Sequence, residues 1–278
     1  MMLASVGESK YVEIDGINTH YVVAGEGSPV LLVHGLGASM VVWRENIAAL
    51  AERFKVYVID LPGHGDTDKP DIEYDAESTV EYLRKFVEHL GVDKIALMGN
   101  SLGGGLVLMT ALAHPEIVSK LALVSSGSLG REVSIWLRLP SLPVIGEFLT
   151  KGPVDNTEFM LRKAFFDKSL ATKELVTELR RTNRLSGGRE AVLKIIRNFI
   201  TMWGVKRQYV RARDVGSLEM PILVVWGAED KMISPKHAYR AARNNSRVDL
   251  HVFSNCGHMA QLERASEFNG IALEFLSQ

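Results

Sequence analysis

The sequence contains one cysteine, Cys256, so no disulfide can form within the chain, and a reducing compartment fits this composition. It also lacks any run of about 18 apolar residues, the length that a membrane-spanning helix needs. The opening stretch, "MMLASVGESKYVEIDG", has neither the basic segment nor the apolar segment of a signal peptide. These absences predict a cytoplasmic protein without stable membrane insertion.

A strong charge of either sign is absent too, since the formal net charge is only -1. Such a chain has no overall electrostatic attraction for nucleic acid, so we expect a small-molecule partner and no nucleic acid. The 278 residues, of which 46% are hydrophobic, fit one large domain or a core with an insertion. A homodimer is compatible with this composition.

Short apolar runs recur along the chain, and they are typical of strands buried on both faces of a parallel sheet. The runs are "PVLLVHG", "FKVYVIDLPGHG", "KIALMGNS", "KLALVSS", "PILVVWGAED" and "VDLHVFSNCGH". An alternating stretch with an Asp-Gly turn, "YVEIDGINTHYVVAG", precedes them and predicts a hairpin. Helical periods such as "TVEYLRKFVEHLG" lie between the runs. This order predicts an α/β fold with a mostly parallel sheet.

Residues 129–216 interrupt this alternation, because no buried-strand run occurs there. Two stretches in this segment, "KELVTELRRTNRL" and "EAVLKIIRNFITMW", have helical periods. The segment also holds 17 Lys and Arg against 9 Asp and Glu, unlike the acidic remainder. We therefore expect a first core part at 1–128, a helical cap at 129–216 and a second core part at 217–278.

One glycine-rich stretch, "GNSLGG" at 99–104, follows an apolar run and precedes a helical period. In a tight strand-to-helix turn Ser101 needs a positive φ, and only small neighbours such as Gly99 and Gly103 avoid a collision. The turn exposes the hydroxyl at a helix N-terminus, where negative charge is favoured. This context indicates a nucleophile elbow. The alternative is a phosphate-binding turn, but the lysine and the glycine spacing of such turns are missing.

A serine nucleophile needs a base, and the base needs an acid that orients it. His258 in "NCGHMAQLE" and Asp230 in "WGAEDKMI" each follow an apolar run. Both therefore fall at carboxyl ends of strands, where open α/β sheets place their sites. The chain order Ser101, Asp230, His258 is that of α/β-hydrolases, and it favours Asp230 over Asp60, Asp66 or Asp68.

The stretch "VHGLGASMVVW" follows the first long apolar run and offers backbone N–H groups for an oxyanion. We expect the N–H groups of Leu36 and Leu102 to form the oxyanion hole. His34 is expected to shape this loop, Trp43 to belong to the core, and His64 to serve a turn.

In combination these motifs closely resemble the α/β-hydrolase superfamily over residues 11–127 and 216–278. The resemblance implies about eight strands, a cap after the sixth, no cofactor and no metal, with Ser101, Asp230 and His258 as catalytic triad. "GNSLGG" is also similar to the meta-cleavage-product C–C hydrolases. Members of that group usually carry tryptophan after the catalytic histidine and a longer glycine-rich oxyanion loop, so Met259 and "HGLGAS" depart from the pattern. Dehalogenases and epoxide hydrolases of this fold use an aspartate nucleophile, which Ser101 argues against.

These residues favour a serine carboxylic-ester hydrolase that acts through an acyl-enzyme on small to medium acyl esters. A C–C hydrolase acting on a dienoic keto acid is the alternative, and Arg184 and Arg189 are candidates to bind its carboxylate. Lactonase and perhydrolase activities need the same groups, and a small-ligand receptor of the same fold is a further alternative. Trp136, in "SIWLRLPSLPVIGEFL", and Met259 are the candidate substrate-binding side chains. Pro140 and Pro143 prevent one regular helix in that stretch.

Overall fold

The computed structural model describes residues 6–151, 155–243 and 245–278. Eight strands form one sheet in the order β1-β2-β4-β3-β5-β6-β9-β10, as expected for the fold class. Their bounds are β1 (Glu8–Ile14), β2 (Ile17–Ala24), β3 (Ser28–Val33), β4 (Phe54–Ile59), β5 (Ile95–Asn100), β6 (Val118–Val124), β9 (Ile222–Gly227) and β10 (Val248–Phe253). From β4 to β10 every neighbouring pair is parallel.

The only antiparallel part of this sheet within the described residues is its β1–β2 edge. Asp15 (φ 52°) and Gly16 (φ 75°) form a two-residue turn between paired Ile14 and Ile17. Two successive positive φ angles are typical of the type I′ turn, whose twist matches that of a hairpin. The predicted hairpin is therefore confirmed, and its second strand continues the sheet next to β4.

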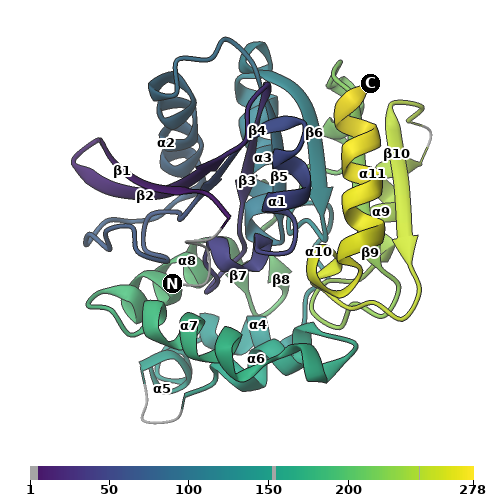
Figure 1. Cartoon of the computed structure of the whole chain (residues 1–278). Helices are drawn as coiled ribbons and strands as arrows, with labels where there is room; N and C mark the ends of the chain where they lie inside the picture. Colours follow the sequence, from purple (N-terminus) through teal and green to yellow (C-terminus); the bar gives the residue numbers. More distant parts are fainter. Residues whose placement is uncertain (1–5, 152–154, 244) are drawn as a thin grey trace.

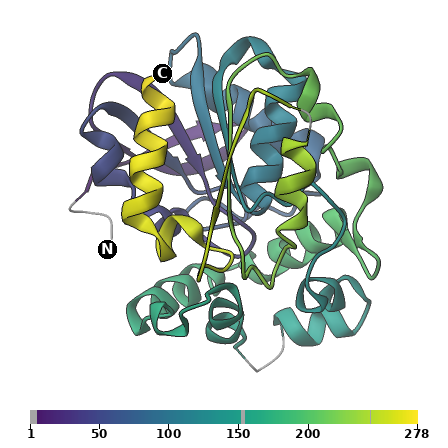
Figure 2. The same ribbon diagram turned by 90° about the vertical axis from the view of Figure 1, so that its right-hand side faces the viewer.

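Helices cover both faces of the sheet. They are α1 (Ile47–Ala51), α2 (Ala76–His89), α3 (Leu102–Ala113), α9 (Lys236–Ala242), α10 (Ala260–Glu263) and α11 (Ala265–Ser277). Figure 2 shows α11, in yellow, on one side of the strands and α9 on the other. Strand β5 is buried along its whole length, which explains why its sequence is a continuous apolar run rather than an alternating one.

Within the described residues, five further α-helices lie between β6 and β9 in the chain, and we call them the inserted helices. They are α4 (Ile135–Arg138), α5 (Ile145–Lys151), α6 (Thr157–Ala164), α7 (Lys173–Asn183) and α8 (Gly188–Phe199). In Figure 1 they gather at one end of the sheet, below the strands. Proline 140 stands in a short 3₁₀ helix, Leu139–Ser141, which separates α4 from α5. The expectation that the prolines interrupt a single helix therefore agrees with the structure.

The end of α8 differs from the expectation. The sequence predicts a helix through "ITMW", but α8 ends at Phe199, and two short strands follow, β7 (Ile200–Thr201) and β8 (Gly204–Val205). Ile200 has extended backbone angles and pairs with Val205 in an antiparallel hairpin. Pairing with Val205 therefore overrides the local helical period at this point.

No helix within the described ranges has both the length and the apolarity needed to cross a membrane. The first five residues, on which part of the signal-peptide expectation rests, lie outside the described residues.

Candidate active site

Ser101 stands at the turn between β5 and α3 with φ 57° and ψ −117°, a conformation that costs free energy for a residue with a Cβ. Backbone hydrogen bonds fix it there. Its N–H donates to the Val124 carbonyl at 2.9 Å, and its carbonyl accepts from the N–H groups of Gly105 at 3.1 Å and Gly127 at 2.9 Å. The strained geometry that the elbow motif predicts is thus present.

The glycines around Ser101 are required by close contact between backbones. A Cβ on Gly99 would lie 2.4 Å from the Gly103 carbonyl oxygen, and one on Gly103 would lie 2.4 Å from that of His34. No side chain fits at either position. Helix α3 is therefore packed directly on the ends of β3 and β5, which fixes where the Ser101 hydroxyl emerges.

His258 and Asp230 come together although 28 residues separate them. The Nδ1 of His258 lies 2.8 Å from Oδ2 of Asp230, and both side chains are almost fully buried. The other oxygen of Asp230 accepts from the N–H groups of Met232 at 2.7 Å and Ile233 at 2.9 Å. The carboxylate is thereby held in one orientation, and it can hold the imidazole in the same way.

The loop after β3 lies directly against the serine, since a Cβ on Gly35 would lie 3.0 Å from that of Ser101. Its turn is closed by the N–H of Ala38, which donates to the Gly35 carbonyl at 3.2 Å, and Gly37 has φ 64°. Leu36 lies inside this turn. Leu102 is the first residue of α3, so its N–H has no acceptor within the helix. Both expected oxyanion donors therefore border Ser101.

His34 supports this loop through both ring nitrogens. Its Nδ1 donates to the Gly35 carbonyl at 2.8 Å, and its Nε2 accepts from the N–H of Leu61 at 3.0 Å. Burial lowers the pKa of His34, which keeps the ring neutral for this pattern. Burial likewise lowers the pKa of His64 to about 3. Trp43 is fully buried, so the expectations for these side chains agree with the structure.

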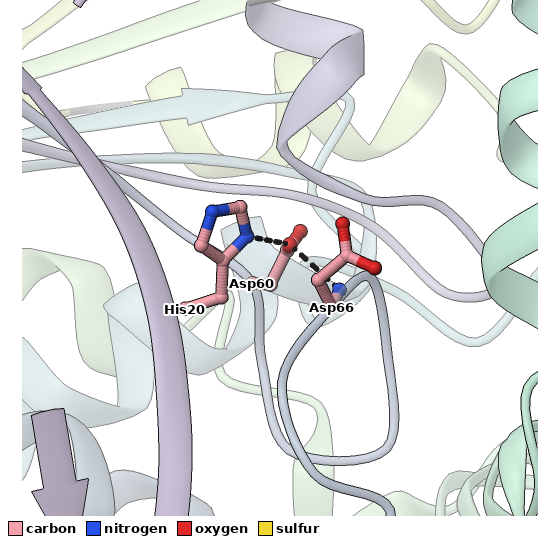
Figure 3. A group of neighbouring side chains, drawn as sticks. All are labelled: His20, Asp60 and Asp66. Atoms are coloured by element: carbon pink, nitrogen blue, oxygen red, sulfur yellow. Dashed lines mark hydrogen bonds and ion pairs between the residues drawn. The ribbon is translucent and has the colours of Figure 1, made fainter. Parts of the chain in front are cut away.

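Figure 3 shows a cluster of His20, Asp60 and Asp66 whose side-chain atoms lie close enough to hold a metal ion. The carboxylate of Asp60 already accepts from His20 at 2.9 Å and from the N–H groups of Met40 at 2.8 Å and Asp66 at 3.0 Å. The carboxylate of Asp66 forms a two-pronged pair with Arg181 of α7. These possible ligand atoms already pair with protein groups, and Asp60 links the cluster to the short 3₁₀ helix Met40–Trp43.

Two cavities meet at Ser101. The larger has a volume of about 260 Å³, and its lining includes Ser101, His258 and both predicted substrate-binding residues, Trp136 and Met259. The smaller has a volume of about 60 Å³, and it is lined by Ser101, the two oxyanion residues and mostly apolar side chains. The larger cavity extends under the inserted helices, and residues of α6 and α7 form part of its lining.

The larger cavity holds more positive charge than the sequence indicates. Arg184 and Arg189 line it as expected, and Arg180 lines it as well. The guanidinium groups of Arg180 and Arg184 lie 2.8 Å and 3.0 Å from the same oxygen of Asp155. Two cations therefore share one carboxylate. Arg180 could be found from the sequence only by its position four residues before Arg184, one helical turn away.

The smaller cavity was not foreseen from the sequence. Besides Ser101, Leu36 and Leu102, it is lined by Gly105, Met109, Gly127, Ser128, Val133, Leu137, Ile195, Ile196, Phe199, Ile200, Val205, Tyr209 and Ile233. The sequence shows that most of these residues are apolar, but its local pattern does not show that they meet at Ser101.

Comparison with known proteins agrees with this geometry. A family model described as the alpha/beta hydrolase fold matches residues 28–265, and the chain belongs to this family. It is 31% identical to the 2-hydroxy-6-oxo-6-(2'-aminophenyl)hexa-2,4-dienoic acid hydrolase of Metapseudomonas resinovorans, over 99% of this chain and 94% of the relative. It is 30% identical to the 2-hydroxy-6-oxononadienedioate/2-hydroxy-6-oxononatrienedioate hydrolase of Burkholderia vietnamiensis, over 96% of this chain and 95% of the relative.

Among solved structures, the chain resembles a variant of the meta-cleavage product hydrolase from Pseudomonas fluorescens IP01 in complex with acetates. The TM-score is 0.82 at 27% identity, and the match covers 96% of this chain and 97% of the other. The protein is therefore an α/β hydrolase, and meta-cleavage product hydrolases are among its similar relatives.

We expect Ser101→Ala to keep the fold and to lose several powers of ten in kcat, because no other hydroxyl replaces a nucleophile held at the elbow. The measurement is hydrolysis of p-nitrophenyl butyrate, with circular dichroism as the check of folding. A folded variant that retains the wild-type rate would exclude Ser101 as nucleophile.

Asp230→Asn should lower kcat by about 10⁴-fold, because an amide opposite Nδ1 favours the wrong imidazole tautomer. Asp60→Asn serves as control, since Asp60 is bonded to other groups and should affect stability more than the rate per folded molecule. If Asp230→Asn is active and the control is not, the acid has been assigned to the wrong carboxylate.

Proposed function

We propose that this protein is a serine hydrolase that cleaves a C–C bond in a 2-hydroxy-6-oxo dienoic acid, with the inserted helices as a cap over the site. One observation carries this proposal: Ser101 stands at the junction of an arginine-lined cavity and a small apolar cavity. A dienoic keto acid has the matching polarity, with a carboxylate at one end and an acyl substituent at the other.

The arginines suit the carboxylate end of such a substrate. Arg180 and Arg184 share the single carboxylate of Asp155, so the pair keeps an unbalanced positive charge beside the cavity. A guanidinium pairs well with a carboxylate because it offers two parallel N–H donors. A simple uncharged ester makes no use of such a group.

The proposed reaction uses the groups at the junction. The Oγ of Ser101 adds to the C6 carbonyl while His258 takes its proton, and the N–H groups of Leu36 and Leu102 bind the oxyanion. Before this addition the proton of the C2 hydroxyl moves to C5, so that the substrate reacts as its 2-keto tautomer. The C5–C6 bond then breaks, its electron pair is delocalised from C5 to the C2 oxygen, and that oxygen takes the proton held by His258. Water releases the acyl group as a carboxylic acid. The sum is one keto acid and one water giving one carboxylic acid and one 2-hydroxydienoate.

Ester hydrolysis by the same serine is the second candidate, and the sequence alone favours it. Met259 supports it, because it follows His258 where meta-cleavage hydrolases usually carry tryptophan, and it lines the larger cavity. Two relatives that match over nearly the whole chain are named as dienoic acid hydrolases, and they favour the C–C reaction. Both reactions form an acyl-enzyme, so they differ in leaving group and not in nucleophile.

The two candidates predict opposite rate ratios. We expect kcat/KM on a 6-isopropyl dienoic keto acid to exceed that on p-nitrophenyl butyrate by at least about tenfold, or about 1.4 kcal/mol of transition-state binding. Arg180→Met should remove most of this excess and leave the ester rate within about twofold, because only the keto acid carries a carboxylate.

Arg197→Met is the matched control. Arg197 is also on an inserted helix and also pairs with a carboxylate, and its side chain is 34% exposed against 35% for Arg180, but it lines neither cavity. A wild-type enzyme that prefers the ester, or a control that loses as much keto acid activity as Arg180→Met, would favour the esterase.

The size of the smaller cavity predicts which acyl groups react. A cavity of about 150 Å³ encloses a benzene ring, so we expect the cavity of about 60 Å³ to admit a short alkyl group but no phenyl group. We expect kcat/KM on p-nitrophenyl isobutyrate to exceed that on the benzoate by at least about tenfold. Phe199→Ala removes an aromatic ring from the wall of this cavity, so it should lower the isobutyrate-to-benzoate ratio of kcat/KM.

Trp136→Ala is the comparison for this series, because Trp136 lines only the larger cavity. It should leave the isobutyrate-to-benzoate ratio unchanged. If Trp136→Ala changes the ratio and Phe199→Ala does not, the acyl group binds in the larger cavity.

A further inference from the structure

Glu263, the last residue of α10, joins two segments that are far apart in the sequence. Its Oε1 accepts from the N–H of Gly257 at 2.8 Å, and its Oε2 accepts from the N–H of Phe166 at 2.7 Å. Gly257 directly precedes His258, and Phe166 lies two residues beyond the end of α6. One carboxylate thus ties the loop of the proposed base to an inserted helix.

A second bond joins the same two segments. The backbone N–H of His258 donates to the carbonyl of Ala164, the last residue of α6, at 2.7 Å. The backbones are in direct contact here, since a Cβ on Gly257 would lie 2.3 Å from the Ala164 oxygen and 2.8 Å from the Phe166 nitrogen. The base is therefore supported from outside the sheet as well as by Asp230.

The helix that provides this support also forms the substrate cavity. Phe159, Met160, Leu161 and Ala164 of α6 all line the larger cavity. The position of α6 thus sets both the shape of that cavity and the place of the histidine loop. A displacement of about 1 Å at a reacting group can cost on the order of a hundredfold in rate.

We propose that Glu263 is a positioning residue that fixes the loop of His258 against α6, so that the imidazole is aligned with Ser101 only while α6 is docked on the core. This inference rests on the proposed role of His258 as base and does not depend on which substrate is cleaved.

The direct test is Glu263→Gln, which keeps one acceptor oxygen and places an NH₂ group opposite the second N–H donor. We expect kcat on p-nitrophenyl butyrate to fall at least about tenfold with KM within about twofold, because the variant releases the histidine loop, whereas α6 stays packed through its buried Leu161 and Ala164 and keeps the cavity wall in place. The rate constant for inactivation by diethyl p-nitrophenyl phosphate should fall by a similar factor, since it reports serine activation without any C–C step.

Asp75→Ala controls for lost stability. Asp75 caps α2 by accepting from the N–H of Ser78 at 2.8 Å, and the loss of such a cap destabilises the folded state. It should lower the melting temperature and leave kcat unchanged. If Glu263→Gln lowers the melting temperature but retains wild-type kcat and the wild-type inactivation rate, Glu263 is only structural and the inference is overturned.

A pair of variants at Phe166 tests the link to α6 without altering the carboxylate. Phe166→Pro removes the closer of the two N–H donors to Oε2 of Glu263 and leaves that of Asp167, at 3.4 Å. The extended backbone of Phe165 suits the residue before a proline. Phe166→Ala keeps the donor. We expect the proline variant to lose kcat as Glu263→Gln does and the alanine variant to retain it; equal kcat in the two would overturn the coupling to α6.

The failure of this inference differs from the failure of the proposed function. A wild-type protein inert to the organophosphate would contradict the serine mechanism, and this inference with it. A reactive wild type beside an equally reactive Glu263→Gln variant would overturn this inference alone.

Discussion

The strained turn at Ser101 is the constraint on which the other features of the site depend. The serine keeps φ 57° because Gly99 and Gly103 bring α3 into direct backbone contact with the ends of β5 and β3. This contact places the first N–H of α3 and the loop of Leu36 on the same side of the hydroxyl. A residue with a Cβ at either glycine would push the helix away and separate Ser101, the proposed nucleophile, from the proposed oxyanion donors.

The core and the inserted helices supply different parts of the site. The ends of β5, β9 and β10 supply Ser101, Asp230 and His258, and the buried sheet holds those ends rigidly. The segment that carries the inserted helices supplies the arginines and most of the lining of the larger cavity. They also bond back to the core loops: the Nδ2 of Asn183 in α7 donates to the Gly37 carbonyl at 2.9 Å, beside the oxyanion loop. The inserted helices therefore support the loops beside Ser101 and also line the larger cavity.

The sequence is sufficient for the part of the site that local pattern determines. The elbow, the strand ends and the order of Ser101, Asp230 and His258 each follow from a few adjacent residues, and the structure brings these side chains to one place.

The arginine pairing and the smaller cavity do not follow in this way. Val133, Phe199 and Tyr209 meet near Ser101 only because of how the inserted helices pack, and helical periodicity shows which face is apolar but not what that face contacts. The hairpin after Phe199 was missed for the same reason, since Ile200 pairs with Val205 rather than continuing α8.

In the proposed reaction, the two unlike cavities that meet at Ser101 orient a dienoic keto acid across its hydroxyl. The most direct measurement is a crystal structure of the Ser101→Ala protein with a 6-isopropyl dienoic keto acid bound. We expect the carboxylate beside Arg180 and Arg184, the isopropyl group in the cavity lined by Phe199, and the C6 carbonyl at residue 101. The reverse orientation, or a keto acid bound with its carbonyl away from residue 101, would contradict this proposal.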